Sequence, residues 1–211
     1  MQQIKETTTY RQALKHRILE TSMAAFAERG IRAVKMDDIA SRLGISKRTL
    51  YEVYDDKEQL LFEGVRKYDR LRKESMSEYA RQAGVSVMDI ILEAYRRHAE
   101  TNRSVNPQFY IDIQKYPCIV RYLKEERERT RDEFMQFLCR GMSEGYFRRD
   151  IDFRLIAHLF EAIGSYTMGN AQLLHEYTFE QLFNGMLLVP LRGFCTEKGI
   201  EVLDRQLKLA E

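Results

Sequence analysis

The sequence predicts an all-α fold. Apolar residues recur three and four positions apart along nearly all of the 211 residues, which is the spacing of one face of a helix. Only 3 prolines and 11 glycines interrupt that pattern, so the connections between helices are expected to be short. No pair of segments shows the alternation that is typical of paired strands. A hydrophobic content of 44% is sufficient for a packed core.

The N-terminal quarter predicts three helices followed by a long fourth one. The first covers residues 10–29 and buries Leu14, Ile18, Met23 and Phe26. Gly30 ends it, because glycine adopts the left-handed conformation at little cost. Two short helices follow over 37–43 and 47–54. The fourth opens at residues 55–58, where aspartates suit the positive end of a helix, and runs to about residue 81. Such a length can link two domains, here predicted over 1–56 and 57–211.

The rest of the chain predicts six further helices, over residues 85–102, 107–115, 118–144, 153–174, 178–195 and 200–209. Thr178 and Gln181 have the spacing of a capping box at the start of the penultimate helix. Pro190 predicts a kink in the C-terminal half of that helix, because proline cannot donate a backbone hydrogen bond.

Charge and cysteine content limit the class of function. The net charge is only +2, and residues 1–57 hold 11 basic against 8 acidic side chains, so any nucleic-acid contact is expected to be local. Cys118, Cys139 and Cys195 show no CxxC spacing, which predicts no disulfide framework, no metal and no cofactor. No apolar run is long enough to cross a bilayer, and we expect a reduced, cytoplasmic location. Catalytic motifs are absent from the sequence, so we expect no enzyme.

Residues 37–54 have the pattern of a helix-turn-helix. Its apolar positions are Ile39, Leu43, Ile45, Leu50 and Val53. Ala40 lets two helices cross closely, Gly44 suits the turn, and Ser46 is placed to cap the second helix. The outward edge is polar and basic, with Lys47, Arg48, Thr49 and Tyr51. The alternative is an ordinary helical hairpin, which would not require this combination.

A family resemblance is carried by the segments Arg17-Ile18-Leu19, Phe26-Ala27-Glu28-Arg29-Gly30, Asp38-Ile39-Ala40, Gly44-Ile45-Ser46-Lys47, Thr49-Leu50-Tyr51, Lys57-Glu58 and Leu60-Leu61. They resemble the TetR family of bacterial transcriptional regulators over about residues 15–62, and residues 144–152 resemble the segment before its dimerising helices. The resemblance implies a three-helix DNA-binding domain joined by a long helix to a C-terminal helical domain for ligand binding and dimerisation. It implies a repressor that leaves its operator when a small molecule binds.

The resemblance implies that Thr49, Tyr51 and Lys57 contact DNA phosphates, and their hydroxyl and ammonium groups are suitable donors. Arg48 is our candidate for reading a base, because its two-pronged guanidinium matches guanine N7 and O6. Many relatives have glycine there. Lys47 is either a phosphate contact or a solvated charge. Lys35 replaces a frequent capping residue and is a further phosphate candidate. Glu52 is acidic, which departs from the family pattern. Its carboxylate either accepts a hydrogen bond from cytosine N4 or, as we favour, turns away from DNA.

One helix-turn-helix buries too little surface for tight specific binding, so we expect a homodimer on a twofold-symmetric duplex operator. Two apolar helices are candidates for its interface, through Leu155, Leu159, Phe160, Ile163, Phe179, Leu182, Phe183 and Met186. The alternative for these residues is a purely internal core.

A set of side chains between the two regions is our candidate for a ligand site: Tyr95, His98, Phe109, Tyr110, Phe134, Phe137 and Met168. These types suit a small hydrophobic or aromatic effector, although aromatic residues at helical spacing also form plain cores. A rival interpretation keeps the DNA-binding helices and makes the remaining helices a docking or architectural module for a protein partner.

Overall fold

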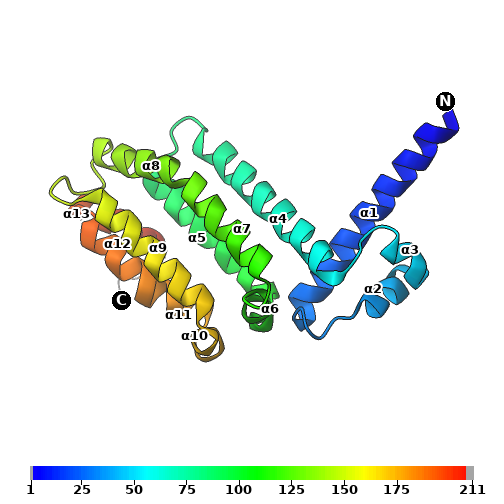
Figure 1. The fold of residues 1–211 in the computed structure, drawn as a ribbon. Helices are drawn as coiled ribbons and strands as arrows, with labels where there is room; N and C mark the ends of the chain where they lie inside the picture. The colour runs from blue at the N-terminus through cyan, green and yellow to red at the C-terminus, as the bar shows by residue number, and fades with distance from the viewer. Residues whose placement is uncertain (1, 208–211) are drawn as a thin grey trace. The chain divides into compact units, whose positions relative to one another are not determined.

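The computed structural model describes residues 2–207, and the side chains of residues 10–167 and 169–207. These residues form helices and no strand, apart from an isolated antiparallel bridge between Phe147 and Cys195. The all-α prediction is therefore confirmed. Contacts divide the chain into two compact units (Figure 1). The first extends to Leu71 and includes Ser104–Val120, and the second contains Arg72–Arg103 and the chain from Arg121 onward.

The first unit is built on α1 (Gln2–Arg29), which begins earlier than predicted. All four residues predicted for its inner face are buried, and Ile18 and Phe26 are completely so. Gly30 ends the helix with φ +83°, as predicted. A β-carbon there would lie 2.8 Å from Cγ of Gln108, so the position excludes a side chain for reasons of space as well as conformation.

The next three helices are α2 (Met36–Leu43), α3 (Lys47–Tyr51) and α4 (Lys57–Ala80). The third is shorter than predicted because Tyr54 turns inward: its ring is fully buried and its hydroxyl donates to Glu63 Oε2 at 3.3 Å. Asp56 caps the fourth helix through Oδ1, which accepts from the Gln59 amide at 2.7 Å.

Helix α6 (Pro107–Ile113) also belongs to the first unit. The Asn106 amide before it donates to the Ala27 carbonyl at 2.7 Å. Asp112 on this helix is completely buried. Its carboxylate accepts from the Arg32 amide and from Gln108 Nε2, both at 2.8 Å. These bonds fasten α6 to the C-terminal end of α1 and to the loop that leads into α2.

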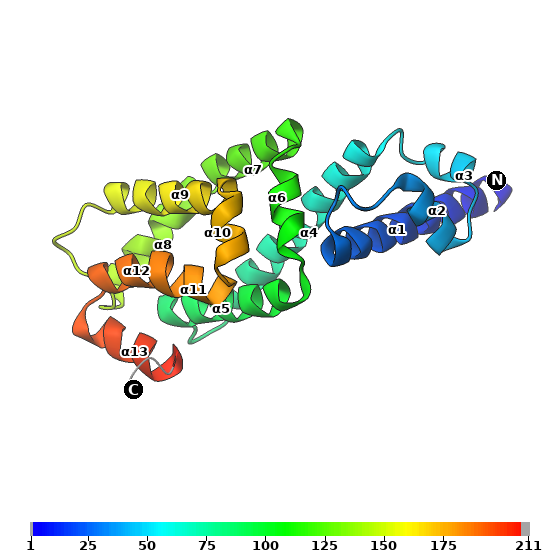
Figure 2. The ribbon, with the colours of Figure 1, turned by 90° about the horizontal axis from the view of Figure 1, so that it is seen from below.

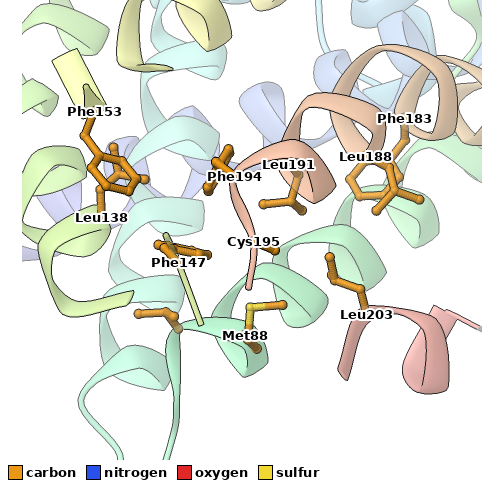
Figure 3. Close-up of a cluster of buried hydrophobic side chains, with 11 residues drawn as sticks. Met88, Leu138, Phe147, Phe153, Phe183, Leu188, Leu191, Phe194, Cys195 and Leu203 are labelled. Atoms are coloured by element: carbon orange, nitrogen blue, oxygen red, sulfur yellow. The ribbon is translucent and has the colours of Figure 1, made fainter. Parts of the chain in front are cut away.

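The second unit packs around aromatic side chains, which Figure 3 shows together. Phe147 is at the centre, with the Phe194 ring 5.0 Å and the Phe153 ring 6.3 Å away between centroids. The core draws on α5 (Val87–Ser104), α8 (Arg131–Ser143), α9 (Phe153–Gly169), α12 (Val189–Phe194) and α13 (Glu197–Leu207). Gly141 is required there, because a β-carbon would lie 2.1 Å from the Phe147 ring.

Two predicted helices are each broken in the structure. The helix predicted over 118–144 is α7 (Pro117–Arg129) followed by α8. At the break, the Thr130 hydroxyl donates to the Glu126 carbonyl at 3.0 Å, a bond that bends helices. The helix predicted over 153–174 is α9 followed by α10 (Ala171–Glu176), because Asn170 Oδ1 accepts from the Leu173 amide and starts a new helix.

The C-terminal helices labelled in Figure 2 are α11 (Phe179–Leu182), α12 and α13. The π-helical η1 (Phe183–Leu188) connects α11 to α12. The capping box is confirmed: Thr178 Oγ1 accepts from the Gln181 amide at 3.2 Å, and Gln181 Oε1 accepts from the Thr178 amide at 2.8 Å. The π-helical turns come just before Pro190, which has no amide hydrogen to continue an α-helical pattern. Residues 208 and 209 of the last predicted helix lie outside the described residues.

Candidate nucleic-acid interface and ligand cavity

The turn between α2 and α3 is built as its sequence requires. Ala40 is buried. Gly44 has φ +66°, and its amide donates to the carbonyls of Ala40 and Ser41 to close α2. Ser46 Oγ accepts from the Thr49 amide at 3.0 Å and caps α3. Leu50 is completely buried and anchors the inner side of α3. The predicted helix-turn-helix is confirmed in its local geometry.

The opposite side of α3 faces outward. Lys47, Arg48 and Tyr51 are exposed, and Thr49 is half-buried with its hydroxyl 2.8 Å from that of Ser46. Arg48 is the most accessible, with 89% of its side chain exposed. Two cations and two hydroxyl groups thus lie on one short helical edge, which is the chemistry that phosphate oxygens and base edges accept.

Each exposed cation on this edge has an acidic neighbour. Lys47 Nζ lies 2.8 Å from Asp37 Oδ1, and this hydrogen bond raises the pKa of Lys47 above its ordinary value. Arg48 Nε donates to Glu52 Oε1 at 3.0 Å. Sequence reasoning missed the role of Asp37, because the contact joins two different helices and depends on their crossing.

The two predicted contacts outside α3 differ in environment. Lys35 is exposed and precedes α2, and its backbone amide donates to Asp38 Oδ2 at 2.9 Å. Lys57 is half-buried, and its ammonium donates to the carbonyls of Ile31 and Val34 at 3.1 and 3.0 Å. Burial lowers the pKa of Lys57. Lys57 therefore holds the loop before α2, and one of its three protons remains for an outside acceptor.

A cavity of about 280 Å³ lies within the second unit. Its lining comprises Ile91, Ala94, Tyr95, His98, Phe134, Phe137, Leu138, Phe160, Phe179, Phe183, Leu187, Leu191 and Phe194. All of these side chains except Tyr95 and His98 are hydrocarbon. The Tyr95 ring lies 4.2 Å from that of Phe183 between centroids, and the His98 ring stacks on Phe179 at 5.6 Å. The arrangement suits a flat apolar molecule.

His98 is the polar group in this lining whose state the contacts define. Its Nε2 lies 3.4 Å from Nη1 of Arg72, and a guanidinium can only donate. Nε2 can accept from this guanidinium when the ring is neutral and carries its proton on Nδ1. Burial, followed by the charge of Arg72, lowers the pKa of His98 below its ordinary 6.5, in agreement with that state.

Four of the seven predicted ligand residues line the cavity, namely Tyr95, His98, Phe134 and Phe137. Phe109 and Tyr110 do not: they are on α6 in the first unit, where their rings meet edge to face at 5.5 Å. The side chain of Met168 lies outside those described. Sequence reasoning missed the contribution of the C-terminal helices, although Phe179 and Phe183 are four residues apart and so share a helix face.

The comparisons with known proteins agree with this geometry. The family model described as "Bacterial regulatory proteins, tetR family" matches residues 18–63, which contain the helix-turn-helix. The HTH-type transcriptional repressor KstR2 of Mycobacterium tuberculosis is 29% identical over 150 residues, covering 66% of this chain and 72% of that protein.

Residues 18–63 form a DNA-binding domain of the TetR family. The fold of the chain is that of solved TetR-family structures. The ketosteroid transcriptional regulator KstR2 of M. tuberculosis has a TM-score of 0.51 at 24% identity, over 87% of this chain and 95% of that one. A TetR-family regulator from Marinobacter aquaeolei has a TM-score of 0.67 at 18% identity, over 92% and 97%. TetR-family members bind DNA and dimerise, so the outward edge of α3 is this chain's candidate DNA-reading surface.

The residues predicted for the dimer interface differ in exposure. Leu155 and Leu159 on α9 are exposed, at 66% and 42%. Ile163 and Met186 are half-buried, and Leu182 is buried. Phe160, Phe179 and Phe183 line the cavity. The two helices were predicted to serve either the dimer or the internal core, and their residues divide between an outer face and the cavity.

Within the described residues, no group of three or more histidine, cysteine or acidic side chains is arranged to hold a metal ion. The same part of the chain contains no helix that is both long and apolar enough to span a bilayer.

Proposed function

We propose that this chain binds a twofold-symmetric DNA operator as a homodimer, represses transcription there, and is released by a small apolar or aromatic effector. The observation that carries the DNA-binding part is the capped helix α3, buried through Leu50 and exposed through Lys47, Arg48 and Tyr51. Such a helix enters the major groove with its N-terminal residues near the bases. The relatives named as repressors support repression over activation.

Within this proposal, Arg48 reads a base. The phosphates are bound by Lys35, Thr49, Tyr51 and Lys57. Phosphate contacts set the position of the protein on the duplex, whereas contacts to base edges discriminate between sequences. Arg48 is favoured for the second task by its exposure and by its place at the second position of α3. Lys47 remains a candidate for either a phosphate contact or a solvated ion pair with Asp37.

Selection of duplexes from a random pool tests this function, with a twofold-symmetric site as the expected product. Arg48→Ala should relax the preference at one position of each half-site, because a bidentate contact to guanine discriminates by about 1–3 kcal/mol. Tyr51→Phe removes only a hydroxyl from an exposed ring, and it should weaken all duplexes alike without changing the selected sequence. Selection of no common site by the wild-type protein would refute sequence-specific binding.

Lys57→Ala requires a second measurement, because Lys57 also holds the carbonyls of Ile31 and Val34. The DNA contact predicts a fall in the salt dependence of binding by about one unit of slope. Loss of the two internal bonds predicts a lower unfolding temperature. A lower unfolding temperature with an unchanged salt slope would assign Lys57 a structural role alone.

The effector part of the proposal rests on the cavity. A volume of about 280 Å³ is at the lower end for small-molecule sites, and it is suitable for about two or three rings. The lining offers no charged side chain, so burial of a charged ligand there would be costly. The neutral His98 offers a polar contact to one hydroxyl or carbonyl group. An uncharged aromatic compound with one such group therefore fits best.

Calorimetry with three probes tests this choice: 2-naphthol, naphthalene and 2-naphthoate. We expect 2-naphthol to bind more tightly than 2-naphthoate, because only the second buries a negative charge. His98→Phe should weaken 2-naphthol and leave naphthalene unchanged. Ala94→Phe should fill the cavity and abolish binding of both while the protein remains folded. Tighter binding of 2-naphthoate, or binding that survives Ala94→Phe, would contradict an uncharged effector in this cavity.

The dimer is proposed to form through the outer face of α9, where Leu155 and Leu159 are exposed, together with the outer faces of α11 and η1. Leu159→Glu should shift sedimentation from dimer to monomer, because a carboxylate would be buried without a partner. Glu161→Gln changes an exposed side chain on the same helix and serves as the control. The rival function, a second domain that only docks a protein partner, is less favoured because it gives no role to the aromatic cavity.

A further inference from the structure

Arg48 and Glu52 are one helical turn apart on the outward edge of α3. Arg48 Nε donates to Glu52 Oε1 at 3.0 Å, and the two side chains are 89% and 60% exposed. Glu52 is the residue that ends the helix, and its amide donates to the Arg48 carbonyl at 2.9 Å. From the other side, Nη2 of Arg11 on α1 donates to the Glu52 carbonyl at 3.3 Å. The backbone that carries this carboxylate is therefore held from two helices.

The position of this bond on the guanidinium determines what remains for DNA. A guanidinium has five N–H donors, one on Nε and four on the two terminal nitrogens. Glu52 occupies the Nε donor, so the bond uses the side of the group and not its end. The two terminal nitrogens then keep a parallel pair of donors, which matches N7 and O6 of guanine. The same bond restricts rotation of an otherwise flexible side chain, so less freedom is lost when the base is bound.

We propose that Glu52 is a positioning residue for sequence reading: its carboxylate holds Arg48 so that the terminal nitrogens of the guanidinium meet guanine. This inference rests on the proposed function, in which Arg48 reads a base. An exposed ion pair of this kind contributes little in water, so its effect belongs to the complex, where water is excluded and charge-assisted bonds strengthen. Glu52 also places a negative charge near phosphates, which weakens binding to any duplex.

These two roles predict effects of opposite sign, which a purely structural role would not produce. The probe is the duplex that the wild-type protein selects from a random pool, compared with a duplex in which the guanine assigned to Arg48 is replaced by adenine. For Glu52→Ala we expect a loss of about 3- to 10-fold in discrimination between these duplexes. Glu52→Gln keeps a neutral acceptor and should lose less. Affinity for an unrelated duplex should stay equal or rise in both variants, because a repulsive charge has been removed.

Asp37→Asn is the matched control. This substitution removes the second exposed carboxylate that pairs with a cation on this edge, because Asp37 Oδ1 lies 2.8 Å from Lys47 Nζ. Asp37 pairs with Lys47 and not with Arg48. It should therefore preserve discrimination at the guanine. In an Arg48→Ala background, Glu52→Ala should have no effect on discrimination, because the side chain that it positions is gone.

The outcomes separate the inference from the function on which it rests. The positioning role is overturned if Glu52→Ala keeps the full discrimination between the guanine and adenine duplexes. It is also overturned if Glu52→Ala loses the same discrimination whether or not Arg48 is present. In both cases the base-reading role of Arg48 stands. Discrimination that survives Arg48→Ala overturns the base-reading assignment and the positioning role with it. Loss of discrimination in Glu52→Ala that requires Arg48 and is absent in Asp37→Asn supports the inference.

Discussion

Replacement of Asp112 tests how the first unit is held together. This carboxylate is completely buried on α6, and it accepts from the Arg32 amide and from Gln108 Nε2 at 2.8 Å each. Lys115 approaches to 3.8 Å from the surface. Asp112→Ala would remove the acceptor for two partly buried donors and leave a small void. Asp112→Asn keeps the shape of the side chain and one oxygen that accepts from one of the two donors. Its NH2 group then faces the other donor, with which it cannot form a hydrogen bond.

The expected cost follows from these contacts. A fully buried donor without a partner costs about 1–3 kcal/mol, and the two donors to Asp112 are neutral and partly buried. The Lys115 contact adds less, because its ammonium is half exposed. We therefore expect Asp112→Ala to lower the free energy of unfolding by about 2–4 kcal/mol. At about 2–4 °C per kcal/mol for a chain of this size, the unfolding temperature should fall by roughly 4–16 °C.

Chemical denaturation followed by circular dichroism measures this loss, and duplex binding measures its consequence. Because Asp112 fixes the loop before α2, DNA affinity should fall together with stability. Glu125→Ala is the control, since Glu125 is exposed on α7 and should change stability by no more than about 0.5 kcal/mol. An Asp112→Ala protein with the denaturation midpoint of the wild type would refute the view that this carboxylate organises the joint between α1 and α6.

Two further predictions concern packing and pH. Gly141→Ala should destabilise by about 1–3 kcal/mol in thermal denaturation, because its β-carbon would meet the buried Phe147 ring, whereas Gly193→Ala has open space and should be neutral or stabilising. Glu20 has a pKa below its ordinary 4.5 through hydrogen bonds from Lys67 and then Tyr68, so its contribution to stability is present above pH 4.5 and lost as the pH falls through the lowered pKa. The stability difference between wild type and Glu20→Gln should vanish in acid, and a difference that persists there would contradict this linkage.

The helix-turn-helix could be predicted because its determinants are local. Gly44 adopts a left-handed turn and Ser46 caps the following helix, each within a few residues of the contact that it makes. Such features depend on residue type and spacing alone. Thr178 and Gln181 form their capping box for the same reason.

The cavity could be predicted only in part, because it depends on which helices meet. Aromatic residues at helical spacing are equally suitable for a core, a cavity or an interface. The sequence predicts Phe109 and Tyr110 at the ligand site, but α6 packs in the first unit through Asp112. Phe183 is predicted at the dimer interface, and in the structure it lines the cavity. The helix breaks were missed because they arise from side-chain bonds to the backbone, as at Thr130.

The division of α9 predicts that effector binding and dimerisation are coupled. Phe160 lines the cavity, while Leu155 and Leu159 are exposed on the same helix. A ligand that displaces Phe160 would move the surface proposed to meet the partner, and coupling between two sites is reciprocal. Leu159→Glu, if monomeric, should therefore bind 2-naphthol with an affinity different from that of the wild-type dimer. Saturating 2-naphthol should then change the dimer dissociation constant measured by sedimentation by the square of that affinity ratio, because each dimer carries two cavities. Equal 2-naphthol affinities of monomer and dimer would show that α9 transmits nothing between its two faces.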